Sequence, residues 1–363
     1  MDKIRPLAEL PNGKKIYSIC GQKFEVPPPY ALTKQIGVGA YGIVCAAQVV
    51  NTAEKVAIKK IPRALDDLRE GKRILREMEI MTTLRHANLI RLHHFLRPQS
   101  KATFEDIYLV MDLYDADLHR IIKSGQALTT EHHQYFMVQA FRGLHHLHSA
   151  KVMHRDMKPS NLLVNADCAL AICDFGLARD DQRGPAADLT QYVVTRWYRP
   201  PEVLGMGPRP YTNAVDVWSL GLIFAELIVG RTLLPGSDYI KQLMLIMNLL
   251  GTPSGEDLEV LSPEARTFLA AQPKHPARPF KELFPMATPE VCDLLSKLLV
   301  FHPEKRISAK EVIEHPYFKK FRDPAQEAGA ENPFVSKYNR EYTAETLRNA
   351  LWDLIVENSP PAG

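Results

Sequence analysis

A change in hydrophobic patterning near residue 112 constrains the fold of this chain more than any other feature. Residues 30–60 and 107–111 contain runs rich in strand-forming residues, and one long amphipathic helix is predicted between them, over 65–84. Beyond about residue 113 the apolar residues recur mainly at helical spacing, over 130–149, 214–229, 239–250, 289–299 and 308–315. The pattern predicts an α+β fold with a small β-rich lobe that carries one long helix, and a larger, mainly α-helical lobe.

The length of the chain supports two lobes, because 363 residues exceed the size at which one hydrophobic core keeps growing. Residues 1–29 end in three prolines and are expected to form a weakly structured N-terminal extension. The small lobe is predicted over about 30–111 and the large lobe over about 118–321, with a hinge over about 112–117. No internal repeat is present in the sequence.

Charge and cysteine content exclude several classes of function. Lys and Arg number 45 against 42 Asp and Glu, and this balance argues against a nucleic-acid or membrane surface. The five cysteines are irregularly spaced, which favours reduced thiols in an intracellular compartment. The longest apolar run, near 220–229, is interrupted by Gly221 and Glu226, so no membrane span is expected. We predict a cytoplasmic protein that also has access to the nucleus.

A glycine-rich segment lies between two predicted strands. Gly37, Gly39 and Gly42 form a G-x-G-x-x-G pattern, and residues without a Cβ let backbone amides approach phosphate oxygens. The same pattern opening a helix would indicate a dinucleotide fold, but residues 43–45 continue as a strand, which favours a hairpin over ATP. Taken alone, the segment also fits an ordinary glycine-rich hairpin.

A lysine and a glutamate that can form an ion pair follow the glycine-rich segment. The strand V-A-I-K ends at Lys59, and Glu77 lies in the long predicted helix. A lysine in a cleft needs a carboxylate to orient it, and Glu77 can form that ion pair. The alternative is a surface lysine on an edge strand, which the position after the glycine loop disfavours.

The most specific motif is H-R-D-M-K-P-S-N at 154–161, followed by D-F-G at 174–176. Phosphoryl transfer needs a carboxylate at the acceptor hydroxyl and oxygen ligands for Mg²⁺. Asp156, Asn161 and Asp174 supply these groups. The glycine loop, the V-A-I-K strand and these two motifs, in this order, resemble the protein kinases, and the resemblance covers about residues 30–321.

The resemblance implies roles for individual residues and the cofactors ATP and Mg²⁺. Asp156, Lys158, Lys59 and Glu77 would be catalytic, and Asn161 and Asp174 would bind the metal. Lys158, two residues after Asp156, is similar to the lysine of serine/threonine kinases, which neutralises charge on the transferring phosphoryl group. The residues expected to bind ATP are Ile36, Gly37, Gly39, Ala40, Tyr41, Gly42, Val44, Ala57, Lys59, Met111, Asp112, Leu113, Tyr114, Asp117, Leu163 and Cys173.

Within the kinases, Thr190-Gln-Tyr192 followed by T-R-W-Y-R resembles the mitogen-activated protein (MAP) kinases. Phosphates on Thr190 and Tyr192 would each add about −1.5 to −2 charge and order the surrounding loop if arginines converge on them. The resemblance implies that Arg76, Arg155 and Arg179 receive phospho-Thr190, and that Arg196 and Arg199 receive phospho-Tyr192.

Several further segments resemble the group that also contains the cyclin-dependent kinases; they are 250–254, the region from there to 284–285, and 303–318. This implies substrates with proline after the acceptor Ser or Thr. The tail, 322–363, resembles a C-terminal extension that packs back on the kinase domain. The implied partners are a dual-specificity MAP kinase kinase, phosphatases and docking-motif peptides, and we expect a monomer.

Three positions depart from the family pattern. Gln191 stands where Glu, Pro or Gly is usual in animal members, which suggests a protozoan-type branch. Pro200 gives Pro-Pro-Glu in place of Ala-Pro-Glu, but Glu202 remains to pair with Arg306, so activity should survive. In the docking patch, Asp323 occupies the first acidic position and Gln326 the second; we expect Glu327 to compensate in part, and basic docking peptides to bind more weakly.

Two other functions were weighed. A pseudokinase scaffold would show damage at Lys59, Asp156, Asn161 or Asp174, and all four are intact. A cyclin-dependent-like kinase is disfavoured by Tyr192 and by the long C-terminal tail. Five histidines crowd one helix without an acid or cysteine at ligand spacing, which favours a packed or solvated surface over a metal site; they are His132, His133, His145, His146 and His148.

Overall fold

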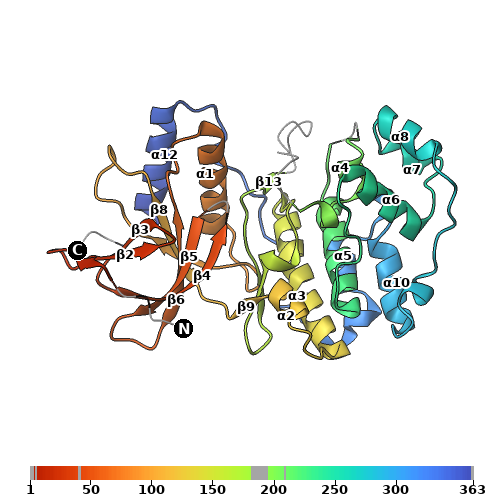
Figure 1. The fold of residues 1–363 in the computed structure, drawn as a ribbon, viewed down its shortest axis with the longest axis horizontal. Coiled ribbons are helices and arrows are strands. Elements are labelled where there is room, and N and C mark those ends of the chain that lie inside the picture. Colours follow the sequence, from red (N-terminus) through yellow and green to blue (C-terminus); the bar gives the residue numbers. More distant parts are fainter. Residues whose placement is uncertain (1–3, 5, 40–41, 181–194, 208–209, 361–363) are drawn as a thin grey trace. The chain divides into compact units, whose positions relative to one another are not determined.

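The computed structural model describes residues 4, 6–39, 42–180, 195–207 and 210–360, and these form two compact units. The small unit comprises Met1–Arg85, Ile90–Tyr114 and Ser336–Gly363, and the large unit comprises His86–Leu89 and Asp115–Val335. The small unit is built on β-sheets and the large unit mainly on helices (Figure 1). The predicted α+β fold class is therefore confirmed.

A five-stranded antiparallel sheet forms the body of the small unit, in the order β4-β5-β6-β8-β7. The strands are β4 (Tyr30–Gly39), β5 (Gly42–Val49), β6 (Lys55–Ile61), β7 (Leu92–Phe95) and β8 (Ile107–Asp112). The register sets Val44 opposite Lys59, and Ala57 opposite Met111. The sheet thus brings together four of the residues expected to bind ATP.

Two helices complete the small unit. Helix α1 (Leu68–Thr83) begins at Asp67, whose side chain accepts hydrogen bonds from two backbone N–H groups of the first turn. Helix α12 (Ala344–Glu357) packs against α1, so closely that a Cβ on Gly71 would lie 2.5 Å from Leu347. The Glu79 carboxylate also accepts a hydrogen bond from Ser336 Oγ at 2.5 Å. The last segment of the chain is therefore part of the small unit.

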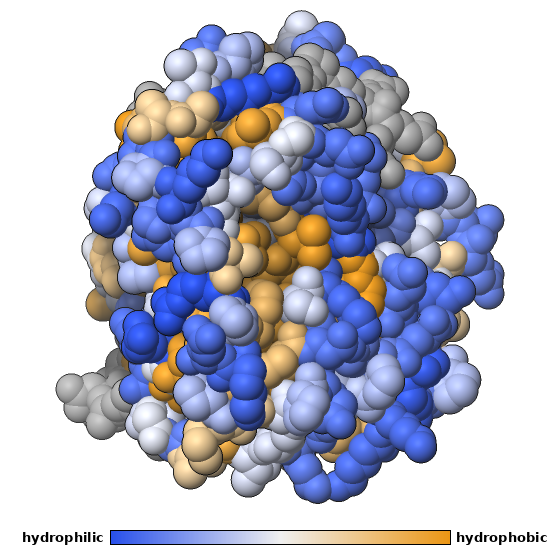
Figure 2. All heavy atoms as spheres, turned by 90° about the vertical axis from the view of Figure 1, so that its right-hand side faces the viewer, coloured by the Kyte–Doolittle hydropathy of each residue, from blue (hydrophilic) through white to orange (hydrophobic). Residues whose placement is uncertain are grey.

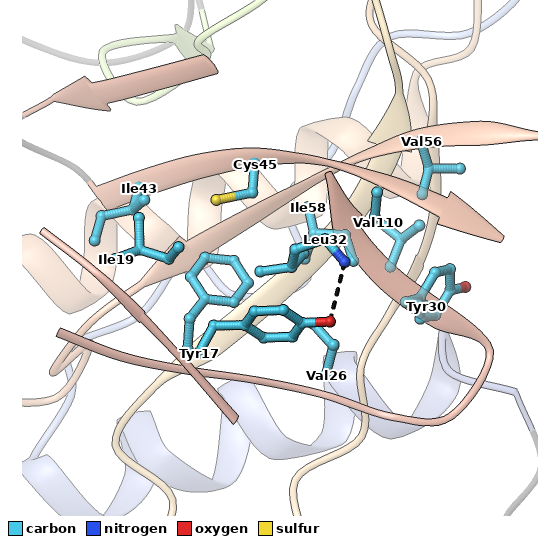
Figure 3. Close-up of a cluster of buried hydrophobic side chains, with 12 residues drawn as sticks. Tyr17, Ile19, Val26, Tyr30, Leu32, Ile43, Cys45, Val56, Ile58 and Val110 are labelled. Carbon is cyan, nitrogen blue, oxygen red and sulfur yellow. Dashed lines mark hydrogen bonds between the residues drawn. The ribbon is translucent and has the colours of Figure 1, made fainter. Parts of the chain in front are cut away.

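The N-terminal residues form a sheet, and the prediction of a weakly structured extension over 1–29 is wrong for its described part. Strands β1 (Ala8–Glu9), β2 (Lys15–Ile19) and β3 (Gln22–Val26) pair antiparallel. Tyr17 and Phe24 are buried in one cluster with side chains from β4, β5, β6 and β8, and Tyr17 Oη accepts a hydrogen bond from Leu32 N at 3.3 Å (Figure 3). The error arose because these strands are short and gain their stability from packing against side chains of β4, β5, β6 and β8.

The large unit contains most of the helices. They are α2 (Leu118–Lys123), α3 (Thr130–Ser149), α4 (Pro201–Leu204), α5 (Ala214–Val229), α6 (Tyr239–Leu250), α7 (Glu256–Glu259), α8 (Pro263–Ala270), α9 (Phe280–Leu283), α10 (Pro289–Leu298) and α11 (Ala309–Ile313), with 3₁₀ turns η1 (Pro159–Asn161), η2 (Arg196–Tyr198), η3 (Pro303–Lys305) and η4 (Pro316–Phe321). Short strands pair as β9 (Ala116–Asp117), β11 (Leu162–Val164) and β12 (Leu170–Ile172), and as β10 (Val152–Met153) with β13 (Arg179–Asp180).

Helices α3 and α5 form the centre of the large unit, and their residues match the predicted ranges. Helix α5 ends at Gly230, whose φ of +72° is the left-handed conformation that glycine adopts without strain. Figure 2 shows the face of this unit on the side of α8 and α10, where polar side chains surround a hollow with apolar walls. Among the described residues, no helix is both long and apolar enough to span a bilayer.

Candidate active site

The glycine-rich segment forms the end of the β4–β5 hairpin. Gly39 pairs with Gly42 at its tip, and Ala40 and Tyr41 lie outside the described residues. Gly42 has a φ of +131°, and a Cβ there would lie 2.0 Å from the carbonyl oxygen of Lys60. A Cβ on Gly37 or Gly39 would meet nothing within 4 Å. The backbone conformation and the close approach of Lys60 thus require glycine at position 42, whereas Gly37 and Gly39 leave open space beside the hairpin.

Lys59 and Glu77 form the predicted ion pair inside the small unit. Lys59 Nζ lies 2.6 Å from Glu77 Oε1, and the two side chains are 13% and 6% exposed. The β6 register and the packing of α1 fix the two ends of this contact. A nearly buried pair of this kind holds the ammonium in one position, where it can bind phosphate oxygens.

The loop after β10 holds Asp156 through its neighbours. Lys158 Nζ donates to Asp156 Oδ2 at 2.6 Å, and Asn161 Nδ2 donates to the Asp156 carbonyl oxygen at 2.8 Å and to Oδ2 at 3.3 Å. Burial raises the pKa of Asp156, Lys158 opposes this rise, and the nearby charge of Asp174 adds to it. The Asn161 nitrogen is used in these bonds, so its oxygen is the atom left to bind a metal.

Asp174 follows β12, and hydrogen bonds of the preceding residue, Cys173, connect it to the loop that contains Asp156. Cys173 N donates to Asn161 O at 2.9 Å, and a ring nitrogen of His154 lies 3.0 Å from Cys173 O. Asp174 has a φ of +68° and Arg155 a φ of +69°, conformations that cost energy for residues with a Cβ. The backbone on both sides of the site is therefore held in place by hydrogen bonds that offset local strain.

A buried carboxylate that the sequence analysis did not identify anchors this loop. Asp216, in α5, accepts hydrogen bonds from His154 N at 2.9 Å, from Arg155 N at 2.7 Å and from the imidazole of His148 at 3.0 Å. Burial favours the neutral acid, but the hydrogen bond and charge of His148, with the other donors, lower the pKa of Asp216 overall. The signal in the sequence was an isolated Asp in a strongly apolar helix.

The other residues expected to bind nucleotide occur in both units. In the small unit, Asp112 Oδ1 lies 2.8 Å from a ring nitrogen of His93. In the large unit, the β9–β11 register sets Asp117 opposite Leu163, and Asp117 caps α2 by accepting from Arg120 N at 2.9 Å. The second segment of the small unit ends at Tyr114, inside the predicted hinge over 112–117. The residues are Ile36, Gly37, Gly39, Gly42, Val44, Ala57, Lys59, Met111, Asp112, Leu113 and Tyr114 in the small unit, and Asp117, Leu163 and Cys173 in the large unit.

The arginines expected to bind phosphate form local groups, whereas Thr190 and Tyr192 lie outside the described residues. The guanidinium groups of Arg196 and Arg199 both lie over the ring of Tyr239, at 5.4 and 5.9 Å from its centroid. Arg155 and Arg199 line one small cavity of about 30 Å³. The β10–β13 register pairs Arg179 with Met153. Arg76 belongs to α1 in the small unit.

Glu202 and Arg306 form the ion pair expected from the sequence. Arg306 donates from its two terminal nitrogens to the two Glu202 oxygens, at 2.6 and 2.7 Å, and both residues are buried. Pro200 precedes α4, and its carbonyl oxygen accepts hydrogen bonds from Val203 N and Leu204 N, both at 3.1 Å. Proline is accommodated at position 200 because the turn uses the backbone carbonyl group of this residue.

The position of Glu327 disagrees with the expectation that it compensates for Gln326 in the docking patch. Glu327 is only 10% exposed and pairs with Arg142 at 3.3 Å and Arg322 at 2.8 Å. It cannot compensate for Gln326 at the surface, because its carboxylate is engaged with buried Arg142 and with Arg322. Asp323 accepts a hydrogen bond from the Gln326 amide and is therefore the acidic group that remains at this position.

Comparisons with known proteins agree with this geometry. A family model described as "Protein kinase domain" matches residues 30–318. The chain is 46% identical over 346 residues to "Extracellular signal-regulated kinase 1" of Dictyostelium discoideum, covering 94% of this chain but only 65% of that relative's length. It is 46% identical over 351 residues to "Mitogen-activated protein kinase homolog NTF3" of Nicotiana tabacum, and 44% over 350 residues to "Mitogen-activated protein kinase 4" of Oryza sativa subsp. japonica; each alignment covers 96% of this chain and 94% of the relative.

Proposed function

Because the chain belongs to the MAP kinases, a family of serine/threonine protein kinases, we propose that it phosphorylates Ser/Thr-Pro sites after a dual-specificity MAP kinase kinase has phosphorylated Thr190 and Tyr192. The observation that supports activity most directly is the arrangement around Asp156. Lys158 and Asn161 hold the carboxylate through Oδ2. Oδ1 is left to accept the hydrogen of a substrate hydroxyl.

Magnesium fits the chemistry of the residues present. The Asn161 amide oxygen and the Asp174 carboxylate are hard oxygen ligands, and Mg²⁺ in nucleotide sites is commonly held by one or two carboxylates together with phosphate oxygens. The hydrogen bond from Cys173 N to the backbone oxygen of Asn161 keeps Asn161 close to Asp174, which follows Cys173 in the chain. Bound MgATP would supply the phosphoryl group and the positive charge that neutralises its oxygens.

The remaining steps are those of positioning. Lys59, held by Glu77, would bind the α- and β-phosphates, and the Lys158 ammonium would stabilise charge on the phosphoryl group as it leaves ATP. Asp156 would orient the attacking hydroxyl oxygen and take its proton. Such positioning and electrostatic stabilisation account for most of catalysis in phosphoryl transfer.

The proposed regulation rests on charge. Arg196 and Arg199 both lie over the ring of Tyr239, and Arg155 and Arg199 line one cavity. Phosphates placed near these guanidinium groups would form charge-assisted hydrogen bonds with them and order the intervening chain. This supports phosphorylation at Thr190 and Tyr192 as the step that turns the enzyme on.

A labelling assay tests the proposed activity. Radiolabelled ATP is supplied with paired Ser-Pro and Ser-Ala peptides, after treatment with an activating MAP kinase kinase. We expect labelling of the Ser-Pro peptide only, a loss of about 10²- to 10⁴-fold for Asp156→Asn, and low rates for Thr190→Ala/Tyr192→Phe. Equal labelling of both peptides would refute proline direction. Unchanged rates in the double variant would refute the phosphoswitch.

The proposed partners and location follow from the family rather than from a feature of the site. We propose a monomer of the cytoplasm and nucleus that phosphatases inactivate and that binds basic docking peptides weakly, through Asp323. Only one acidic side chain is available at that position, because Glu327 is engaged with Arg142 and Arg322. Tight binding of a basic docking peptide that is lost in Asp323→Asn would contradict the proposed weakness.

A further inference from the structure

The large unit contains a cavity of about 300 Å³ that the proposed phosphoryl transfer does not use. Its walls come from the C-terminal end of α3, the N-terminal end of α5 and the segment that leads from η3 into α11. Lys158, Asn161 and Asp174 are not among the residues that line it. The volume lies at the lower end of the range for small-molecule sites, so the cavity can hold a compact ligand.

The cavity is lined by apolar residues together with a few positively charged and hydrogen-bonding residues. Ala214, Val217 and Ile307 supply apolar surface. Polar residues on the lining include His145 and Lys310, and no described lining residue is an acid. A mostly apolar cavity with a few convergent polar groups is typical of a ligand site.

The charges near the cavity favour an anion. Burial lowers the pKa of His145, and the charges of His148 and Lys310 lower it further, although Glu314 acts in the opposite direction. The Arg306 charge is already neutralised by Glu202, whereas Lys310 is exposed. The N-terminal end of α5, at Asn213 and Ala214, adds the positive end of a helix dipole.

We propose that this cavity binds a small carboxylic acid with an apolar body. The carboxylate would pair with Lys310 and hydrogen-bond to His145, and the apolar body would pack against Ala214, Val217 and Ile307. Charge complementarity selects an acid over a neutral or cationic ligand of the same shape.

The cavity is also connected to the catalytic loop. His148 lines the cavity and its imidazole lies 3.0 Å from Asp216 Oδ2. Asp216 in turn accepts hydrogen bonds from the backbone N–H groups of His154 and Arg155. A ligand that packs against His148 would restrict its motion and so hold the loop more firmly. Occupancy should therefore slow local opening around these two amides.

Calorimetric titration of the full chain with 4-phenylbutanoate tests the site, with the isosteric 4-phenylbutanamide as the uncharged comparison. A ligand of this size should bind in the micromolar to millimolar range, and the acid about five- to tenfold more tightly than the amide at low salt. Lys310→Met should remove this preference, whereas Lys319→Met, at an exposed lysine outside the lining, should keep it. Equal affinities for acid and amide, or no effect of Lys310→Met, would overturn the assignment.

Filling the cavity provides the second test. Ala214→Trp should abolish binding of both probes, and Ile307→Phe should do the same if the tryptophan variant fails to fold, as judged by circular dichroism. Probe binding that survives in a folded cavity-filling variant would place the ligand elsewhere and refute the proposal.

Hydrogen exchange tests the connection to the loop, and it does not depend on kinase activity. Saturating 4-phenylbutanoate should slow amide exchange in a peptide spanning 150–158 several-fold in the wild-type chain. The slowing should be lost in His148→Leu even when the probe is bound. Binding without a change in exchange of this peptide would refute the coupling.

Discussion

Replacing Asp216 by asparagine should loosen the catalytic loop and lower stability by a calculable amount. The carboxylate is fully buried and accepts three hydrogen bonds, one at Oδ1 from Arg155 N and two at Oδ2 from His148 and His154 N. Asparagine has one oxygen of this kind, so its NH₂ group must face at least one of the donors. An orphaned buried donor costs about 1–3 kcal/mol. Removing the buried negative charge that these donors share raises the total to about 3–5 kcal/mol.

The loss of stability is measurable by denaturant unfolding. A change of 3–5 kcal/mol is a large share of the roughly 5–15 kcal/mol that stabilises a domain. It corresponds to a decrease in Tm of roughly 6–20 °C for a unit of this size. A displacement of the loop by about 1 Å would lower kcat about 100-fold, since Asp156 lies one residue beyond Arg155.

A double-mutant cycle separates the loop contact from general destabilisation. Asp216→Asn and His148→Leu should be non-additive by about 0.5–3 kcal/mol, because the two side chains are in contact. A loss below about 1 kcal/mol for Asp216→Asn together with wild-type kcat would refute the reasoning, since a buried donor cannot lose its acceptor without cost.

Three further results are expected. Burial raises the pKa of Asp156 and Lys158 opposes this rise. Lys158→Met should therefore move the acidic limb of the pH profile of kcat/KM to higher pH. An unmoved limb would show that Lys158 does not control the pKa of the Asp156 carboxylate. Burial and the nearby His146 lower the pKa of His86 to about 4, so the folded state resists its protonation and up to about 3 kcal/mol of stability should be lost as pH falls from 6.5 to 4. Urea unfolding of His86→Gln should lose this pH dependence. Phe24→Ala should cost about 3–5 kcal/mol by the same method, since Phe24 is 0% exposed; a loss below 1 kcal/mol would mean that the N-terminal sheet contributes little.

The helices of the large unit could be predicted from the sequence because their signals are local. Helix α3 begins after Thr129, which caps it together with His132, and α5 ends at Gly230. Caps and helical periodicity reside in neighbouring residues and need no knowledge of distant contacts. The N-terminal strands were missed although their apolar residues alternate, because short strands gain their stability from a surface contributed elsewhere in the chain.

The chemical groups of the site were predicted, but the residues that support them were not. Asp156, Asn161 and Asp174 belong to motifs whose spacing carries the signal. Asp216 acts on a loop 61 residues away from it, and a single acid in an apolar helix does not reveal its partner. Glu327 was placed at the surface for the same reason, since its partner Arg142 lies 185 residues earlier in the chain.

The small unit is closed by a segment that a ribosome would make only after the whole of the large unit. Residues 336–363 belong to it, while residues 115–335 of the large unit are contiguous and are complete before that segment emerges. Until α12 covers α1, the surface around Gly71 that Leu347 occupies stays exposed to water. During synthesis the large unit can therefore finish folding first, although its chain follows most of the small unit, and the uncovered apolar surface of the nascent small unit is prone to aggregation until α12 is made.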